Sequence, residues 1–173
     1  MILGIDIDDT ITDSSKTIDI YLKKEYPDYD NYHMLPKKEY KRFLKKYIKE
    51  MRDAYPIKEG VLEAWDYFKK NHFKIILITA RDNKNYRGNI KDTKKFLARH
   101  GIFYDKIYFK QKKKGKKARK EHVDLFIDDK ENNLDSVSRY GISCVCFGKS
   151  SKYPSFLDWY SLLDYIKEVE QHE

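Results

Sequence analysis

The sequence predicts an α/β fold: a Rossmann-like parallel sheet of about five strands flanked by helices, with a small helical insertion after the first strand. Two observations support this prediction. Short apolar runs of strand length alternate with segments that have helical periodicity, and three of the runs end in acidic or hydroxyl side chains. Alternating strands and helices imply parallel pairing with right-handed crossovers, so ligands should bind at the carboxyl ends of the strands.

The first strand is an apolar run from Ile2 to Ile5 that leads into two carboxylates, Asp6 and Asp8. A helix capped by Ser14 or Ser15 should follow and end before Pro27. A second amphipathic helix is indicated by apolar residues at three- and four-residue spacing: Tyr40, Phe43, Leu44, Tyr47, Ile48 and Met51. We therefore expect residues 14–55 to form the insertion and residues 1–13 and 56–173 to form the α/β core.

The remaining elements alternate to the end of the chain. The pattern predicts, in order, a helix from Val61 to Phe68, a strand over 74–78, a loop over 83–89, a helix over 93–100, a strand over 107–109, a short helix in the basic run, a strand over 123–128, a helix over 134–140, a strand over 143–147 and a terminal helix over 159–166. Gly101 and Gly141 end two of these helices.

The composition indicates a globular chain that does not cross a membrane. Of its 173 residues 40% are hydrophobic and 37% are charged, and no apolar stretch approaches the length of about 20 residues that a bilayer requires. Asp6 interrupts the apolar N-terminal run, which argues against a signal peptide. Cys144 and Cys146 are two residues apart on a predicted strand, so both project from the same face and are poorly placed to form a disulfide with each other. We therefore expect a cytoplasmic protein without membrane partners.

The net charge of +8 comes from one segment. Lys110 to Lys120 contains eight cations and no acid, while the other 28 Lys and Arg residues balance the 28 Asp and Glu residues. Such a run is either a solvated loop and helix start or a patch that attracts anions, including nucleic acid, to a nearby site.

The strand ends carry groups suited to phosphate chemistry. An aspartate can attack phosphorus and form an acyl-phosphate, provided that a cation neutralises the phosphate. Asp6 and Asp128 offer the hard oxygen ligands that Mg²⁺ prefers, and Asp8 could exchange a proton with the leaving oxygen and the attacking water. Thr79 offers a hydroxyl to a phosphoryl oxygen, and a lysine would offset the remaining charge.

The motifs Asp6-Ile7-Asp8-Asp9-Thr10, Ile78-Thr79-Ala80-Arg81 and Ile127-Asp128-Asp129 resemble motifs I, II and IV of the haloacid dehalogenase (HAD) phosphatase superfamily, in the family's order. The resemblance implies that Asp6 is the nucleophile, Asp8 the general acid and base, and Thr79 a phosphate ligand. It also implies that Asp6, Asp128 and the backbone carbonyl of Asp8 bind Mg²⁺, with Asp129 as an auxiliary ligand.

Some assignments stay open. Asp9 stands where many relatives carry glycine, and it adds a charge beside the site. Lys117 and Lys114 are the candidates for the motif III lysine by their spacing to Asp128, with Lys116 as a third. Ala80 and Arg81 are expected to bind substrate, although Arg81 could equally pair with a nearby acid.

The insertion lies where relatives carry a cap over the active site. Together with the motifs, it resembles the 5′(3′)-deoxyribonucleotidase branch, which implies a small phosphorylated substrate, a nucleoside monophosphate. One alternative is a polynucleotide 3′-phosphatase that holds nucleic acid through Lys110–Lys120. Another is a phosphate- or nucleic-acid-binding module without catalysis.

Overall fold

A computed structural model describes residues 1–84 and 86–171, so Asn85 of the predicted 83–89 loop and the last two residues lie outside the described part. The strands are β1 (Ile2–Ile5), β2 (Lys74–Ile78), β3 (Lys106–Tyr108), β4 (Leu125–Asp128), β5 (Ser143–Phe147) and β6 (Ser155–Phe156). They form one sheet in the order β3-β2-β1-β4-β5-β6, and every pair is parallel. The predicted parallel α/β fold is confirmed, with β6 as an additional strand. At two residues, β6 is too short to show any apolar periodicity.

Helices cover both faces of the sheet. On one face lie α3 (Val61–Lys70), α4 (Asn89–Arg99) and α7 (Trp159–Gln171), whose apolar residues pack with Ile75 and Leu77 of β2. On the other face lie α5 (Gly115–Lys120) and α6 (Glu131–Ser138), which pack with Ile76 and Ile78. Successive strand residues point to opposite faces, so a strand buried on both sides is apolar throughout.

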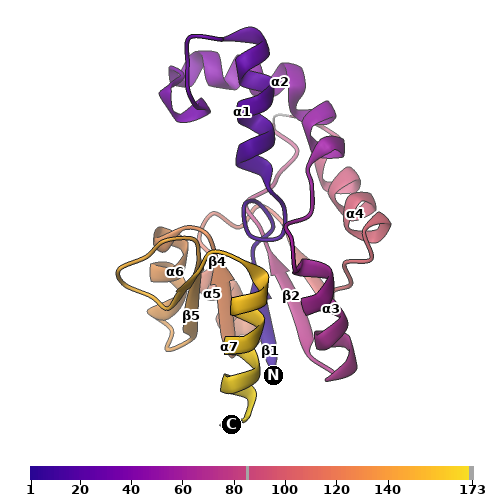
Figure 1. Ribbon diagram of the computed structural model, residues 1–173, viewed down its shortest axis with the longest axis vertical. Coiled ribbons are helices and arrows are strands. Elements are labelled where there is room, and N and C mark those ends of the chain that lie inside the picture. Colours follow the sequence, from indigo (N-terminus) through magenta and orange to yellow (C-terminus); the bar gives the residue numbers. More distant parts are fainter. Residues whose placement is uncertain (85, 172–173) are drawn as a thin grey trace.

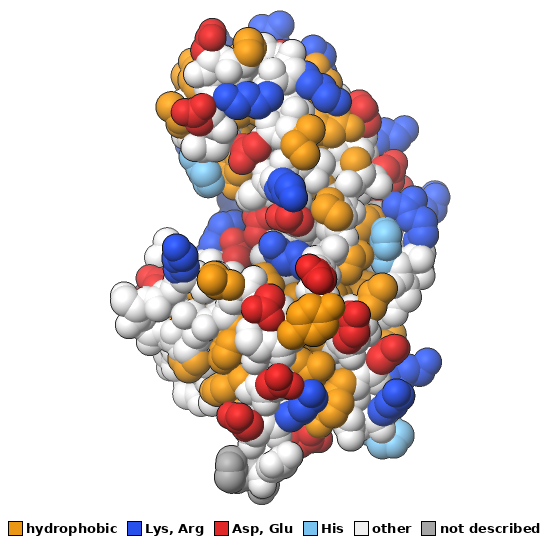
Figure 2. All heavy atoms as spheres, viewed as in Figure 1, with side chains coloured by type: hydrophobic (Ala, Val, Ile, Leu, Met, Phe, Trp, Pro, Cys, Tyr) orange, Lys and Arg blue, Asp and Glu red, His pale blue; other side chains and the backbone are white. Residues whose placement is uncertain are grey.

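Residues 14–55 are helical, with α1 (Ser14–Glu25), the 3-10 helix η1 (Tyr32–Met34) and α2 (Lys37–Ala54). Figure 1 shows α1 and α2 beyond the carboxyl ends of the strands, and Figure 2 shows a hollow between these helices and the sheet lobe. The apolar side of α2 still joins the main core, because Phe43, Ile48 and Met51 belong to the same buried cluster as the strands. Within the described residues, none of the helices has the length and apolar character needed to cross a membrane.

Candidate active site

The strand order brings the three predicted motifs together. β1 is hydrogen-bonded to β2 on one side and to β4 on the other. The residues that end these strands, Asp6, Thr79 and Asp128, therefore lie at one edge of the sheet and are all buried. The edge lies where the chain changes direction across the sheet, which is the usual ligand position in this topology.

A buried ion-pair cluster occupies this edge. The Lys114 ammonium lies 2.8 Å from Oδ1 of Asp6 and 2.6 Å from Oδ2 of Asp128. All three side chains are almost inaccessible, with 1% of Lys114, 7% of Asp6 and 0% of Asp128 exposed. One cation thus neutralises part of the charge of two carboxylates that are almost fully buried.

Asp128 is oriented by the start of α6. Its Oδ1 accepts hydrogen bonds from the backbone N–H of Lys130 at 2.9 Å and from Nδ2 of Asn133 at 2.8 Å. Asn133 is a site residue that the motifs did not reveal. Its position in the first turn of a helix that follows an acid-ended strand was the only indication in the sequence that it could contact the acid.

The cluster fits a divalent cation. Asp6, Asp128 and Asp129 offer carboxylate oxygens that lie within 4.8 Å of one another. Oδ1 of Asp129 is buried and has no hydrogen-bond partner among the described residues. Hard anionic oxygens with one acceptor left unsatisfied are the donor set that Mg²⁺ takes.

The pKa values of these acids reflect crowded, buried negative charge. Burial raises the pKa of Asp6 to about 6, with the Asp128 and Asp8 carboxylates adding to the effect and Lys114 opposing it. Burial likewise raises the pKa of Asp129 to about 7, against the Lys130 ammonium. A bound cation would stabilise the charged form of both groups.

The structure brings Lys114, and neither Lys117 nor Lys116, to the carboxylates. Lys117 instead lies over the Tyr108 ring, 4.2 Å from its centroid, and Lys116 is exposed on α5. The expectation that Lys117 acts in the site is therefore corrected to Lys114. The reason is the close packing of α5 on α6: a Cβ added at Gly115 would lie 1.9 Å from the Ser136 carbonyl oxygen. This approach places Lys114, which directly precedes α5, over Asp128.

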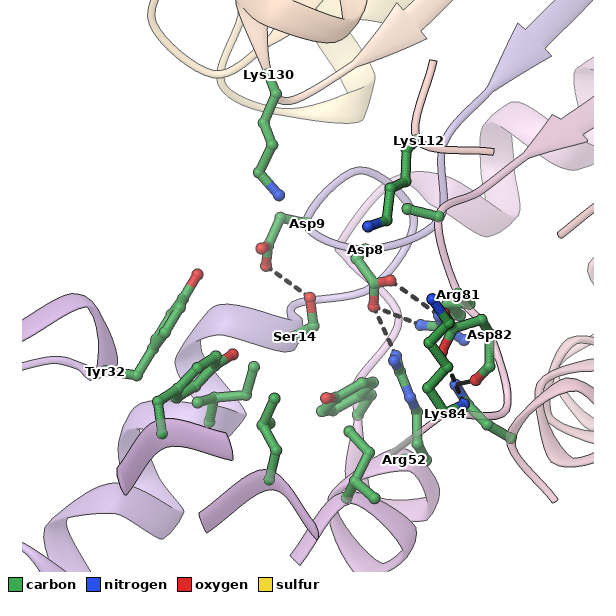
Figure 3. A pocket seen from close by; sticks show the side chains of 17 residues that line it. Asp8, Asp9, Ser14, Tyr32, Arg52, Arg81, Asp82, Lys84, Lys112 and Lys130 are labelled. Atoms are coloured by element: carbon green, nitrogen blue, oxygen red, sulfur yellow. Dashed lines mark hydrogen bonds and ion pairs between the residues drawn. The ribbon is translucent and has the colours of Figure 1, made fainter. Parts of the chain in front are cut away.

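Asp8 is held by two arginines. Arg81 donates from Nε to Oδ2 at 3.0 Å and from Nη2 to Oδ1 at 2.7 Å, and Arg52 of α2 donates to Oδ1 at 2.7 Å. Burial would raise the pKa of Asp8, but the Arg52 and Arg81 guanidiniums outweigh it and hold that pKa well below its usual range. Asp8 is therefore a carboxylate here, and its side chain points toward the guanidiniums of Arg52 and Arg81 (Figure 3).

Arg81 makes the ion pair that one of its two interpretations predicted. Its third donor, Nη1, bonds to Oγ1 of Thr93 at 3.1 Å, and only 2% of the side chain is exposed. Arg81 also lines the cavity, so its guanidinium, which is bound by protein groups here, adjoins the space that a substrate would occupy. Arg52 was not found from the sequence, because no motif marks a residue that reaches the site from the insertion.

Asp9 connects the site to the start of α1. Its backbone has φ of 58°, the left-handed region that glycine adopts freely and that aspartate tolerates. Its carboxylate accepts hydrogen bonds from Oγ of Ser14 at 2.9 Å and from the backbone N–H of Ser15 at 2.7 Å. Ser14 and Ser15 thus start the helix as hydrogen-bond donors to Asp9. Neither is its N-cap, a position that falls on Asp13.

Thr79 and Ala80 lie at the carboxyl end of β2. Thr79 is fully buried, and its Oγ1 accepts a hydrogen bond from the Arg81 N–H at 3.2 Å. Ala80 is exposed and lines the cavity beside Asp8. The end of β2 therefore presents a small side chain to the cavity and keeps the hydroxyl inside.

A cavity of about 410 Å³ separates this edge from the insertion. Its insertion side is aromatic and apolar, and the rings of Tyr32 and Tyr40 stack there with centroids 5.4 Å apart. Its core side is charged. Figure 3 shows Lys112 and Lys130 reaching into the cavity beside Asp8 and Asp9. The cavity therefore suits a ligand that has a flat apolar part and an anionic part.

No protein-family model and no curated protein match the sequence. Solved structures do share the fold. A haloacid dehalogenase-like family hydrolase from Streptococcus pneumoniae matches with a TM-score of 0.70 and 16% identity, over 95% of this chain and 97% of its own. A structure described as a predicted phosphatase from Clostridium acetobutylicum matches with a TM-score of 0.71 and 13% identity, over 96% and 98% of the two chains.

CbbY from Rhodobacter sphaeroides, in complex with xylulose-(1,5)bisphosphate, matches with a TM-score of 0.63 and 10% identity, over 93% of this chain and 95% of its own. Identities this low describe a shared fold. The chain has the α/β fold of haloacid dehalogenase superfamily hydrolases, as its three strand-end motifs predicted.

Proposed function

We propose that this protein is a Mg²⁺-dependent phosphomonoester hydrolase that acts through an aspartyl-phosphate on Asp6. The observation that carries the proposal is the buried cluster in which Lys114 lies within 2.8 Å of both Asp6 and Asp128, beside Asp129. Two structures with the same fold are described as predicted phosphatases, which is consistent with this chemistry.

In the proposed reaction a carboxylate oxygen of Asp6 attacks phosphorus, and the bond from phosphorus to the ester oxygen breaks. The leaving oxygen takes up a proton. Water then attacks the phosphorus of the acyl-phosphate, which restores the Asp6 carboxylate and releases phosphate. Lys114 offsets charge on Asp6 throughout, because it is held at the same position by Asp128.

Asp6, Asp128 and Asp129 would hold the Mg²⁺. When bound, the ion would neutralise the charge of the phosphate and so permit attack by a carboxylate. Asn133 and the Lys130 N–H keep Asp128 oriented for this role.

Asp8 is the proposed proton donor and acceptor. Whether it can take up a proton depends on its contacts with Arg52 and Arg81. A carboxylate that accepts three hydrogen bonds from Arg52 and Arg81 does not carry a proton near neutral pH. Asp8 therefore acts as an acid only when these contacts loosen, for example when a phosphate competes for the guanidiniums. If they never loosen, this proton transfer is lost, which favours the alternative of a binding module without catalysis.

The favoured substrates are nucleoside monophosphates. The stacked Tyr32 and Tyr40 rings present a flat surface to a base, and the lysines at the opposite side of the cavity attract its phosphate. A polynucleotide 3′-phosphatase is the second candidate. It is supported by the basic run, in which Lys110, Lys112 and Lys113 are exposed close to the cavity that Lys112 lines.

The test is phosphate release with Mg²⁺ and with EDTA from 5′- and 3′-nucleoside monophosphates, sugar phosphates and a 3′-phosphorylated oligonucleotide. We expect Mg²⁺-dependent release that Asp6→Asn lowers by at least about 1,000-fold. Asp66→Asn, an exposed change on α3, is the matched control. Unaltered hydrolysis in Asp6→Asn would refute the aspartyl-phosphate. Binding of nucleotides without hydrolysis by the parent protein would support the binding module, and preference for the oligonucleotide would favour the 3′-phosphatase.

A further inference from the structure

A second cavity adjoins the first at the carboxyl end of β2. It has a volume of about 580 Å³, and it is lined by Ala80, Asp82, Asn83, Lys84, Lys110 and Lys112. Ala80, Asp82, Lys84 and Lys112 also line the first cavity. A ligand in the first cavity can therefore extend into the second past Ala80.

The second cavity is positively charged. It contains three lysines and one acid, Asp82. Across residues 1–84 and 86–171, no carboxylate lies within 4.0 Å of the Lys84, Lys110 or Lys112 ammonium. The Asp82 carboxylate forms no ion pair with these ammonium groups. It accepts a hydrogen bond from the backbone N–H of Lys84 at 2.9 Å. Ammonium groups gathered without a partner favour an anionic ligand.

The backbone holds these lysines beside the site. The N–H of Lys110 donates to the Arg81 carbonyl at 3.0 Å, and the N–H of Gln111 donates to the Thr79 carbonyl at 2.9 Å. Lys110 has φ of 63°, an uncommon conformation for a side chain of its size. Further along the loop, Lys114 is fixed by Asp6 and Asp128. The loop that carries Lys110 and Lys112 is thus attached at both ends to the catalytic edge of the sheet.

Lys84 is held from the other side of the cavity. The turn that contains it is closed by the bond between Asp82 and the Lys84 N–H, and the Asp82 carbonyl accepts Nδ2 of Asn89 at 2.7 Å. Asn89 begins α4, so the turn is attached to a helix of the core. Two separate core segments therefore direct cations to one cavity.

We propose that this second cavity is an anion subsite for a phosphate that is not hydrolysed, so that the preferred substrates carry two phosphates on one sugar. A nucleoside 3′,5′-bisphosphate has this chemistry, and so does the terminal nucleotide of a nucleic-acid strand. The inference rests on the proposed function, because it assigns the substrate class of the same site.

The experiment compares the KM values of adenosine 5′-monophosphate, adenosine 3′,5′-bisphosphate and a 3′-phosphorylated oligonucleotide at low salt. We expect the KM of the bisphosphate to be at least tenfold below that of the monophosphate. Lys110→Gln should raise the bisphosphate KM by about five- to tenfold and leave kcat unchanged, because one phosphate contact is lost. The monophosphate KM should change by less than about twofold, since Lys110 lines only the second cavity.

Lys116→Gln is the matched control, because it removes the same charge from the same basic run at a residue that lines neither cavity. Equal KM values for monophosphate and bisphosphate, or an equal loss in Lys116→Gln, would overturn the subsite while leaving the hydrolase proposal intact. An oligonucleotide KM below that of the bisphosphate would identify a strand as the source of the second phosphate. The reverse order would identify a small bisphosphate.

If no hydrolysis is found, calorimetry with the same compounds decides the question. Binding of the bisphosphate at least tenfold tighter than the monophosphate, weakened in Lys110→Gln and retained in Lys116→Gln, would support the subsite although the hydrolase proposal had failed. Binding of both compounds with the same affinity would overturn it.

Discussion

The carboxylate cluster and the cavity beneath the insertion are neighbours with opposite properties. In the cluster, Asp6, Lys114 and Asp128 are almost fully buried, and the core strands and α5 determine their positions. In the cavity, Tyr32, Tyr40 and Lys112 are partly or fully exposed and come from three different segments. Under the proposed function, the sheet edge would set the reaction, while the insertion and the lysine loop would set which molecule enters.

Asp8 links the two regions. It follows β1 two residues after Asp6, yet its carboxylate is bound by Arg52 of the insertion. A shift of the insertion would therefore change the partners of a proposed catalytic group. The following predictions test how far the two regions are separate, from the largest expected effect to the smallest.

The largest effect is expected for Lys114→Met. It leaves the Asp6 and Asp128 carboxylates buried without their cation, which should lower the free energy of unfolding by about 3–5 kcal/mol. Hydrolysis should fall by at least about 100-fold. Urea unfolding in EDTA and turnover with Mg²⁺ measure the two effects.

Lys117→Met is the matched control, since its ammonium lies over the Tyr108 ring and its loss should cost no more than about 1 kcal/mol. A greater loss of turnover in Lys117→Met than in Lys114→Met would show that the cluster is not the reaction centre.

The stability of the metal-free protein should fall as pH rises from about 4 to about 7. The pKa values of Asp6 and Asp129 are raised in the folded state to about 6 and about 7. Their contribution is therefore fully present below the unfolded pKa and is lost as pH rises through the folded values, by a few kcal/mol in order of magnitude. The lowered pKa of Asp8 acts mainly below about pH 5, and the pKa of His100, lowered by burial, acts against this loss within the window.

Urea unfolding in EDTA at several pH values measures this dependence. Asp129→Asn should reduce the slope, and Asp66→Asn should leave it unchanged. Saturating Mg²⁺ should remove most of the loss, because the cation favours the carboxylates. If the metal-free protein became more stable from pH 5 to pH 7, the pKa values of Asp6 and Asp129 would not be raised by burial and neighbouring carboxylates as described above.

A smaller effect is expected for Arg52→Gln, which removes the ion pair between the insertion and Asp8. Arg81 still binds Asp8, so the free energy of unfolding should fall by about 1–2 kcal/mol. Lys46→Gln removes the exposed pair with Glu25 and should leave the urea midpoint almost unchanged. Equal urea midpoints for the two variants would mean that Arg52 does not hold the insertion to the core.

The smallest effect is expected for Tyr40→Leu. It removes one ring of the stacked pair and should raise the KM of nucleoside monophosphates by about three- to tenfold. The KM of ribose 5-phosphate, which has no base, is the internal control and should not change. Parallel increases for both substrates would place the base elsewhere in the cavity.

The sequence predicted most of the fold because most of the strands are continuous apolar runs bounded by polar residues. β2 spans Lys74–Ile78 and β5 spans Ser143–Phe147, as the pattern indicated. β3 lies one residue earlier than predicted, at Lys106–Tyr108. β6 went unnoticed, because a two-residue strand forms through its partner rather than through its own composition.

The residues at the strand ends of the candidate site were predicted from the sequence, but those contributed by other segments were predicted only in part. Asp6, Thr79 and Asp128 follow strands, so the sheet topology alone brings them to one edge. Lys114 could not be separated from Lys117 by spacing, since the choice depends on how closely α5 packs on α6 at Gly115. Arg52 is 44 residues from Asp8, and no local pattern reports such a contact.

By itself, the sequence determined the parallel α/β fold and the acids and hydroxyl at its strand ends, because the apolar run of a strand and the polar residues that end it are local properties. The tertiary structure alone decided which lysine neutralises the carboxylates, that Asp8 is bound by arginines from both the core and the insertion, and that two cavities join beside Ala80. These features depend on distances between segments far apart in the chain, and packing, rather than local pattern, sets those distances.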